Sequence, residues 1–409
     1  MNPSTAALPH RHLASVRVPT KKQWIFDGDE RSLRPVEELA GTDPAYNHEI
    51  AYLTSIISAW AYSDAETLAS KLQYYGLEGA HIRQITVVNN ALLVVATGYF
   101  ILSKTGRVGI VAFRGTDPAS FITWLTDAQV QQRAFLGGHV HSGFYGNVKA
   151  VWEGVAQAVS VARDGQFLDG VSRDNRHKLV KLKSNLKTLY ITGHSLGGAM
   201  AVLAAARLLK GDFGEWPAEV LRGVYTFGQP MVGDAGFASY VAERFGDRLY
   251  RHVYADDVVP HLPPKSAFDY VHVGQELHAG GPNEGWVPSR DVAERANAAA
   301  ALISSSVTAF EARVSPNIRI GKYSIDDHMP SNYVDVSRNF GEKAAVIQGP
   351  PGRGLVGLVT HNVNTAMTAA TGALGIHRAD GLRGSFSRWS RILGVGGPRS
   401  GVTNPSGSA

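Results

Sequence analysis

The chain has 409 residues, of which 44% are hydrophobic, so it can bury a large core. It contains no cysteine, which excludes a disulfide framework, a thiol nucleophile and a zinc site built on cysteines. Its formal charge is +5, and residues 345–409 contain six arginines and one aspartate, so this excess belongs to the tail. Because the rest of the chain is close to neutral, we expect no nucleic-acid partner.

No segment has the length and hydrophobicity of a transmembrane helix. The longest apolar stretch, 91–102, is short and contains Thr97 and Gly98. The first twenty residues lack the hydrophobic region of a secretory signal. We therefore predict a protein that is cytoplasmic or peripheral to a membrane.

The predicted elements divide the chain into three regions. Residues 1–35 are polar and interrupted by prolines, which indicates a flexible N-terminal arm. Residues 36–345 carry regular hydrophobic patterns and form the predicted folded domain. Residues 346–409 are rich in Gly, Ser and Arg, a composition typical of disorder.

The first half of the folded domain begins with helices and continues with strands. Apolar residues at helical spacing predict the first helix, and Ser63 followed by Glu66 fits a capping box for the second. The expected elements are helices over 48–62 and from 63 to about 76, and strands over 85–88, 92–102 and 108–113.

In the second half, helices and strands alternate. This alternation is typical of an α/β sheet whose ligand site lies at the carboxyl ends of parallel strands. An Ala-rich helix over 291–314 indicates a helical insertion at about 285–315. The other expected elements are helices over 148–162, 198–209 and 235–245, and strands over 189–191, 224–227 and 249–254.

Ser195 lies where one predicted strand gives way to a helix. Gly193 and Gly197 stand two residues before and after it, where a sharp turn leaves no room for a Cβ atom. This setting predicts a serine nucleophile, with the N–H of Leu196 at the helix start as one donor to an oxyanion. In the alternative interpretation, the Ser195 hydroxyl only caps the helix.

A serine nucleophile needs a general base, and the base needs an acid that orients it. Asp256 and Asp257 directly follow the predicted strand at 249–254 and precede a proline-rich segment, where a carboxylate can be held rigidly. One of the two aspartates is expected to serve only as a turn or helix cap.

Four sequence blocks, taken together, resemble the class 3 (fungal-type) lipase family of α/β-hydrolases. The resemblance covers residues from about 50 to 340 and implies an α/β-hydrolase fold with a central, mostly parallel sheet flanked by helices. The blocks are Phe113-Arg114-Gly115-Thr116, residues 140–144, residues 193–198 with 225–234, and residues 257–263.

The resemblance implies a role for individual residues. Ser195 is the nucleophile, Asp257 is the acid with Asp256 as the weaker contender, and His328 is the base. Thr116, after a predicted strand and a glycine, is the first oxyanion donor beside Leu196.

The alternative bases are His272 and His278, because His261 is too close in sequence to Asp257. His194, beside the nucleophile, is expected to be structural.

Residues 117–125 match the region where the family carries its lid. Phe121, Ile122, Trp124 and Leu125 form a short apolar face with polar neighbours. Such a face suits either a lid that turns toward lipid or a fixed helix packed on the core. The sequence leaves these two alternatives open.

These implications describe a serine carboxylic-ester hydrolase, a lipase that cleaves acylglycerols or related lipid esters through an acyl-enzyme. No cofactor and no metal are required.

Phospholipase A1 or short-chain esterase activity is the alternative within this class, since pocket walls determine acyl length and head group. A non-catalytic lipase-like interaction protein is the alternative of another class. The expected partner is a lipid ester, while contact with a lipid interface and the oligomeric state stay open.

Overall fold

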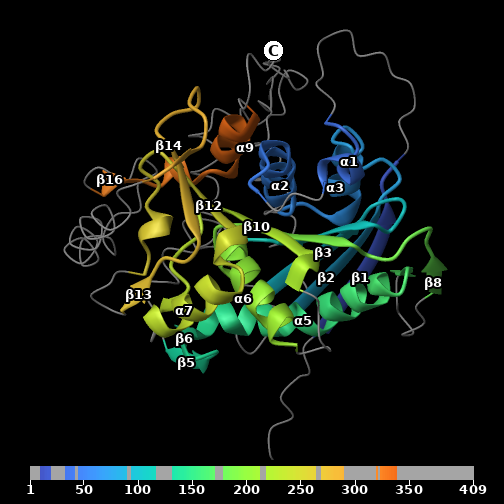
Figure 1. Cartoon of the computed structure of the whole chain (residues 1–409), viewed down its shortest axis with the longest axis horizontal. Helices are drawn as coiled ribbons and strands as arrows, with labels where there is room; N and C mark the ends of the chain where they lie inside the picture. The colour runs from blue at the N-terminus through green and yellow to red at the C-terminus, as the bar shows by residue number, and fades with distance from the viewer. Residues whose placement is uncertain are drawn as a thin grey trace, which may run out of the picture.

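The computed structural model describes residues 10–19, 33–41, 45–89, 94–116, 131–170, 178–211, 218–263, 269–289, 319–320 and 323–338. These residues form the predicted α/β-hydrolase fold, in which helices cover both faces of one large sheet (Figure 1). Within these ranges, no helix combines the length and apolar character needed to cross a bilayer.

Nine strands of the described residues form the large sheet, in the order β1-β2-β3-β4-β9-β10-β12-β14-β15. The pairs from β4 through β14 are parallel, whereas the pairs toward both edges are antiparallel. Parallel pairing brings the carboxyl ends of the central strands to one edge of the sheet. The strands are β1 His10–Arg17, β2 His81–Asn89, β3 Val94–Leu102, β4 Val108–Phe113, β9 Thr188–His194, β10 Leu221–Phe227, β12 Leu249–Tyr254, β14 Gln275–Ala279 and β15 Val287–Pro288.

The alternation of side chains along each strand divides the core into two halves. On β3, Phe100 and Leu102 pack under α5, α6 and α7, whereas Tyr99 and Ile101 pack under α2, α3 and α9. Figure 1 shows these two helical layers on opposite sides of the sheet. The helices are α1 Val36–Leu39, α2 His48–Trp60, α3 Ala65–Leu72, α5 Ser142–Arg163, α6 Leu196–Lys210, α7 Ala235–Arg244 and α9 Pro330–Arg338.

Short strands and 3₁₀ turns complete the described structure. One small sheet pairs β13, β11, β6 and β5 in that order, and two hairpin-like pairs join β7 to β8 and β16 to β17. The bounds are β5 Gln132–Phe135, β6 Gly138–His141, β7 Gln166–Asp169, β8 Lys178–Lys181, β11 Gly233–Asp234, β13 Tyr270–Val271, β16 Arg319–Ile320, β17 Tyr323–Ser324, η1 Ala218–Val220, η2 Gly246–Arg248, η3 Val259–His261 and η4 Asp326–His328.

The helices and strands expected between residues 48 and 254 are present, but the second helix has a different cap. Asp64 caps α3, since its carboxylate accepts the N–H of Thr67 at 2.7 Å. The hydroxyl of Ser63 instead donates to the carbonyl oxygen of Trp60 at 2.6 Å. A carboxylate at this position also interacts favourably with the positive end of the helix dipole.

The N-terminal arm predicted over residues 1–35 is wrong for the part that forms β1. This strand pairs antiparallel with β2 from His10 to Arg17. Leu13 packs against one half of the core, and Val16 against the other. The edge of β2 offers unpaired backbone groups, so a short segment of modest hydrophobicity is held in place by pairing. Residues 1–9 and 20–32 lie outside the described residues.

The insertion predicted at about 285–315 begins with a strand and not with a helix. Val287 and Pro288 form β15, which pairs antiparallel with β14. Proline is tolerated on such an edge strand because the open side of the strand needs no N–H for the hydrogen-bond ladder. The predicted helix at 291–314, the lid segment 117–125 and the tail 346–409 all lie outside the described residues.

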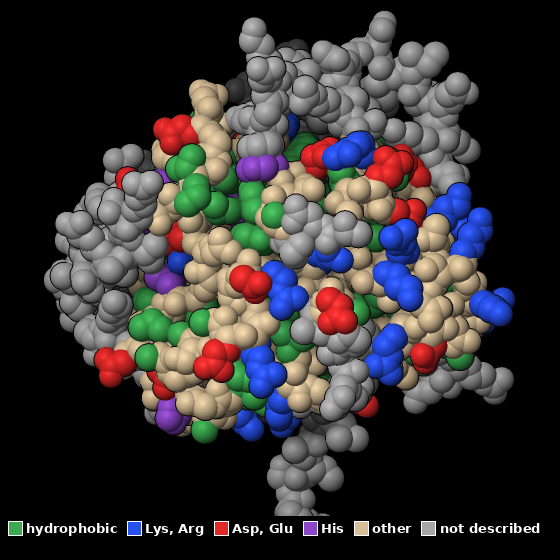
Figure 2. Space-filling view, viewed as in Figure 1, with side chains coloured by type: hydrophobic (Ala, Val, Ile, Leu, Met, Phe, Trp, Pro, Cys, Tyr) green, Lys and Arg blue, Asp and Glu red, His purple; other side chains and the backbone are tan. Residues whose placement is uncertain are grey.

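Basic side chains gather on the side of the molecule that carries β8, at the right of Figures 1 and 2. Lys178 and Lys181 of β8 are exposed, as are Lys183 and Lys187 between β8 and β9. This surface adjoins the start of β9, whereas Ser195 follows the end of that strand. The basic surface is therefore separate from the candidate site.

Candidate active site

Ser195 occupies the sharp turn that joins β9 to α6. Its backbone has φ +58° and ψ −129°, and the residue is fully buried. A Cβ atom on Gly193 would lie 2.2 Å from the carbonyl oxygen of Gly197. A Cβ atom on Gly197 would in turn lie 2.2 Å from the carbonyl oxygen of Phe113. The two glycines are therefore required by the close packing of this turn.

The strained backbone of the turn leads to a stability prediction. We expect Ser195→Gly to raise the free energy of unfolding by about 1 kcal/mol, because glycine adopts this positive φ without a steric cost. The measurement is a comparison of urea midpoints and m-values for the variant and the unaltered protein. A lower midpoint with an unchanged m-value would contradict the assignment of strain to this residue.

Asp257 lies three residues beyond the end of β12, and its carboxylate is completely buried. One oxygen, Oδ1, accepts the N–H of Val259 at 2.8 Å. The other, Oδ2, lies 2.7 Å from Nδ1 of His328. Asp256 is exposed to solvent, so the aspartate that meets the imidazole is Asp257.

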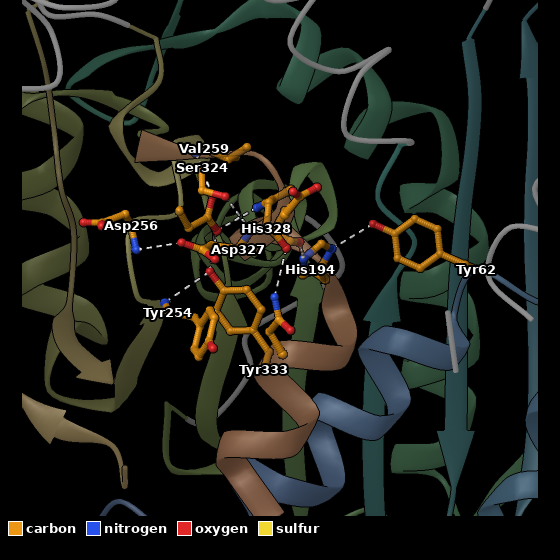
Figure 3. Close-up of polar contacts among 12 residues, drawn as sticks. Tyr62, His194, Tyr254, Asp256, Val259, Ser324, Asp327, His328 and Tyr333 are labelled. Carbon is orange, nitrogen blue, oxygen red and sulfur yellow. Dashed lines mark hydrogen bonds and ion pairs between the residues drawn. The ribbon is translucent and has the colours of Figure 1, made fainter. Parts of the chain in front are cut away.

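His328 comes from η4, more than seventy residues after Asp257, and backbone pairing brings the two segments together. Asp257 and Ser324 form an isolated parallel bridge. The N–H of Val258 donates to the carbonyl oxygen of Ser324 at 3.3 Å. The N–H of Ser324 donates to the carbonyl oxygen of Asp256 at 2.8 Å. The side chain of Asp327 adds a third link, since it accepts the N–H of Asp256 at 3.1 Å (Figure 3).

The two alternative histidines lie elsewhere. His278, on β14, has its Nε2 atom 3.1 Å from the carbonyl oxygen of Ala255. His272 follows β13 and is partly buried. The buried carboxylate of Asp257 pairs with His328 instead.

The Ser195 hydroxyl and the Nε2 atom of His328 are both buried, and neither has a hydrogen-bond partner among the described residues. The bond that a resting triad contains is therefore not formed here. The segments that carry the two side chains nevertheless lie next to each other. The N–H of Ser195 donates to the carbonyl oxygen of Phe227 at 2.9 Å. A Cβ atom on Gly228, the residue after Phe227, would lie 2.7 Å from Cε1 of His328. Catalytic hydrogen bonds are often long without substrate and tighten when it binds.

The two predicted oxyanion donors belong to segments that meet at Ser195. Leu196 is the first residue of α6, where backbone N–H groups have no acceptor within the helix. Thr116 follows the end of β4, whose Phe113 pairs with Gly193. A Cβ atom on Gly115 would lie 2.6 Å from the carbonyl oxygen of His194, so the chain leaves β4 directly against the nucleophile strand.

His194 holds the backbone of the candidate base. Its Nε2 atom donates to the carbonyl oxygen of His328 at 2.8 Å. Its Nδ1 atom accepts a hydrogen bond from the hydroxyl of Tyr62 at 2.9 Å (Figure 3). Burial is the main cause that holds the pKa of His194 well below its ordinary value, and the charge on His328 lowers it further. A neutral ring with its proton on Nε2 fits both bonds, consistent with the expected structural role.

Tyr333 is a site residue to which the sequence analysis gave no role. Its hydroxyl donates a short hydrogen bond to Oδ2 of Asp257, the oxygen that also meets His328. Burial is the main cause that raises the pKa of Tyr333 well above its ordinary value, and the charge of Asp257 raises it further. The phenol therefore keeps its proton. The only available signal was an aromatic residue shortly after the candidate base.

No cluster of three or more histidine, aspartate or glutamate side chains in the described ranges is arranged to hold a metal ion. The groups that meet at the site are a hydroxyl, an imidazole and a carboxylate. A hydroxyl on a strained turn, a carboxylate-bound imidazole with its second nitrogen unpaired and a helix N-terminus are the groups that acyl transfer uses.

Comparison with known proteins finds a family that matches part of the chain. Residues 110–267, which contain Ser195 and Asp257, match the family described as lipase (class 3). This part of the chain is therefore similar to the class 3 lipases. It is 34% identical over 169 residues to a lipase of Rhizomucor miehei, a match that covers 41% of this chain and 40% of that protein.

Two further comparisons give similar matches. The chain is 34% identical over 190 residues to the secreted mono- and diacylglycerol lipase 1 of Fusarium solani, which covers 45% of this chain and 48% of the relative. The solved structure of the native Rhizomucor miehei lipase propeptide complex matches with a TM-score of 0.47 at 23% identity, over 71% of this chain and 80% of that one. The chain thus spans about half or less of the length of these two curated relatives.

Proposed function

We propose that this class 3 lipase homologue is a serine carboxylic-ester hydrolase that cleaves acylglycerols or related lipid esters. The observation that carries the proposal is the buried Asp257–His328 pair at 2.7 Å, which leaves Nε2 of His328 unpaired beside the turn that holds Ser195. The alternative role of Ser195 as a helix cap is not supported, because its hydroxyl makes no capping bond in α6.

In the first half of the reaction, the Ser195 oxygen attacks the ester carbonyl carbon while Nε2 of His328 accepts the hydroxyl proton. Asp257 stabilises the imidazolium and keeps the proton-bearing Nδ1 atom in place. The N–H groups of Thr116 and Leu196 hold the negative oxygen that forms. His328 then passes its proton to the leaving alcohol, and the acyl group stays on Ser195.

In the second half, His328 removes a proton from water, and the hydroxide attacks the acyl carbon. The tetrahedral intermediate collapses, the fatty acid leaves, and Ser195 recovers its proton from His328. The same three side chains therefore serve both steps, and each proton that is taken up is later returned.

The choice of lipid ester follows the names of the relatives, which are a lipase and a mono- and diacylglycerol lipase. Phospholipase A1 and short-chain esterase are variants of the same reaction, which differ in the walls that receive the acyl chain and head group. They are separated by measurement of rates and not by the catalytic groups.

The proposal is tested by covalent trapping and by a substrate series. The protein is treated with a p-nitrophenyl alkylphosphonate, and we expect one equivalent of nitrophenolate to be released and one phosphonyl group to appear on Ser195 in the peptide mass spectrum. Hydrolysis is then measured for p-nitrophenyl esters of increasing chain length, emulsified triacylglycerol, and vesicles of phosphatidylcholine.

Each outcome has a definite meaning. Phosphonylation with the highest rate on emulsified acylglycerol supports the lipase assignment. Phosphonylation with a rate that peaks on short soluble esters or on phosphatidylcholine replaces it by the corresponding variant. Absence of both phosphonylation and hydrolysis would favour a non-catalytic interaction protein and overturn the proposal.

A further inference from the structure

Tyr333 contacts the candidate acid from the same element that follows the candidate base. His328 ends η4, and Tyr333 lies five residues later in α9. Its side chain is fully buried, and the hydroxyl donates to Oδ2 of Asp257. In Figure 3, the Tyr333 ring lies below His328 in the view.

The same hydroxyl also holds the turn that carries Asp257. It accepts the N–H of Tyr254 at 3.3 Å, while the N–H of Asp257 donates to the carbonyl oxygen of Tyr254 at 3.0 Å. Within this turn, Ala255 has φ +43°, a conformation that costs a non-glycine residue free energy. The hydroxyl of Tyr333 therefore joins the first residue of a strained turn to the side chain of its last residue.

Two donors share one carboxylate oxygen. Oδ2 of Asp257 receives both Nδ1–H of His328 and the hydroxyl of Tyr333, whereas Oδ1 receives the N–H of Val259. A phenol that donates to a carboxylate withdraws part of the negative charge that the imidazole experiences. It also leaves the carboxylate little freedom to rotate away from the ring.

We propose that Tyr333 is a positioning residue, which fixes the Asp257 carboxylate in the plane that the His328 imidazole requires and limits the charge that this carboxylate presents to the ring. This role rests on the proposed function of the site. Since Tyr333 and His328 belong to one continuous segment, a displacement of α9 moves the base and the group that orients its acid together.

The test compares Tyr333→Phe with a matched variant, Tyr225→Phe. The Tyr225 hydroxyl is also buried in the same half of the core and accepts one backbone N–H, that of Asn47 at 3.1 Å, but it lies on β10 and makes no bond to Asp257. Both variants lose one buried hydroxyl, so their shared loss of stability is a common baseline.

We expect Tyr333→Phe to lower kcat about tenfold with KM little changed, because orientation of the base affects the transition state more than substrate binding. The acidic limb of the kcat/KM profile should move to higher pH, since an unshared carboxylate stabilises the protonated imidazole more strongly. Tyr225→Phe should keep the profile of the unaltered protein.

A spectroscopic measurement is independent of turnover. In the far-downfield proton spectrum, the Nδ1 proton of His328 is assigned by its loss in Asp257→Asn. We expect it to move further downfield in Tyr333→Phe and to stay unchanged in Tyr225→Phe.

An unshifted resonance and an unchanged pH profile in Tyr333→Phe would overturn the positioning role, while ester hydrolysis by the unaltered protein would still support the proposed function. If the unaltered protein hydrolyses no ester, the proposed function fails. The downfield resonance then decides alone whether Tyr333 orients the carboxylate.

Discussion

Ser195→Ala is expected to reduce ester hydrolysis to near the uncatalysed background, a loss of about 10⁶-fold in kcat. Without the hydroxyl, no acyl-enzyme forms, and His328 has no proton to accept from this residue. Alanine keeps the Cβ atom that serine already places on the positive-φ turn, so the fold should be retained. The measurement is the rate on a short p-nitrophenyl ester at high enzyme concentration, together with the phosphonylation assay.

The matched control for this variant is Ser55→Ala. Ser55 is also buried, but its hydroxyl donates only within α2, to the carbonyl oxygen of Tyr52 at 2.8 Å. This control should keep its activity and react with the phosphonate. Undiminished hydrolysis by Ser195→Ala would show that another group is the nucleophile.

Asp257→Asn is expected to give the second largest effect, a loss of about 10⁴-fold in kcat. The amide carries no negative charge to stabilise an imidazolium, and its NH₂ group can stabilise the wrong tautomer of His328. Asn is nearly isosteric with Asp, so the backbone links between the segments of Asp257 and Ser324 should be retained. The pH dependence of kcat and the thermal midpoint are measured in parallel.

The chain provides a close control at the preceding position. Asp256 carries the same side chain but is exposed, and it contributes to the site through its backbone N–H and carbonyl oxygen. Asp256→Asn should therefore retain activity. If Asp256→Asn lost activity and Asp257→Asn kept it, the assignment of the acid would be reversed.

Local patterns were sufficient for the elements of the fold and for the nucleophile. The strands and helices around Ser195 follow from short-range periodicity, and Gly193 and Gly197 mark the turn because a local clash admits no larger residue. The start of the chain was the main exception. Residues 10–17 have little pattern of their own, and they form β1 because β2 offers them an edge.

Local patterns were not sufficient for the partners of the nucleophile. Asp256 and Asp257 follow the same strand, and no feature of the nearby sequence distinguishes their side chains. The distinction arises where the segment with Ser324 pairs with Asp257, which buries one carboxylate against His328 and leaves the other in water. The preference for His328 over His272 and His278 likewise came from a family resemblance and not from spacing.

The linear order of residues thus specifies a hydroxyl on a strained turn, because strain and glycine placement are properties of a few adjacent residues. Long-range packing alone brings the imidazole to its carboxylate and adds Tyr333, Tyr62 and the side chain of His194 around them. These contacts join residues 71 to 134 positions apart. A hydrogen bond requires atoms about 3 Å apart, and over such separations only the folded sheet and its helices determine that distance.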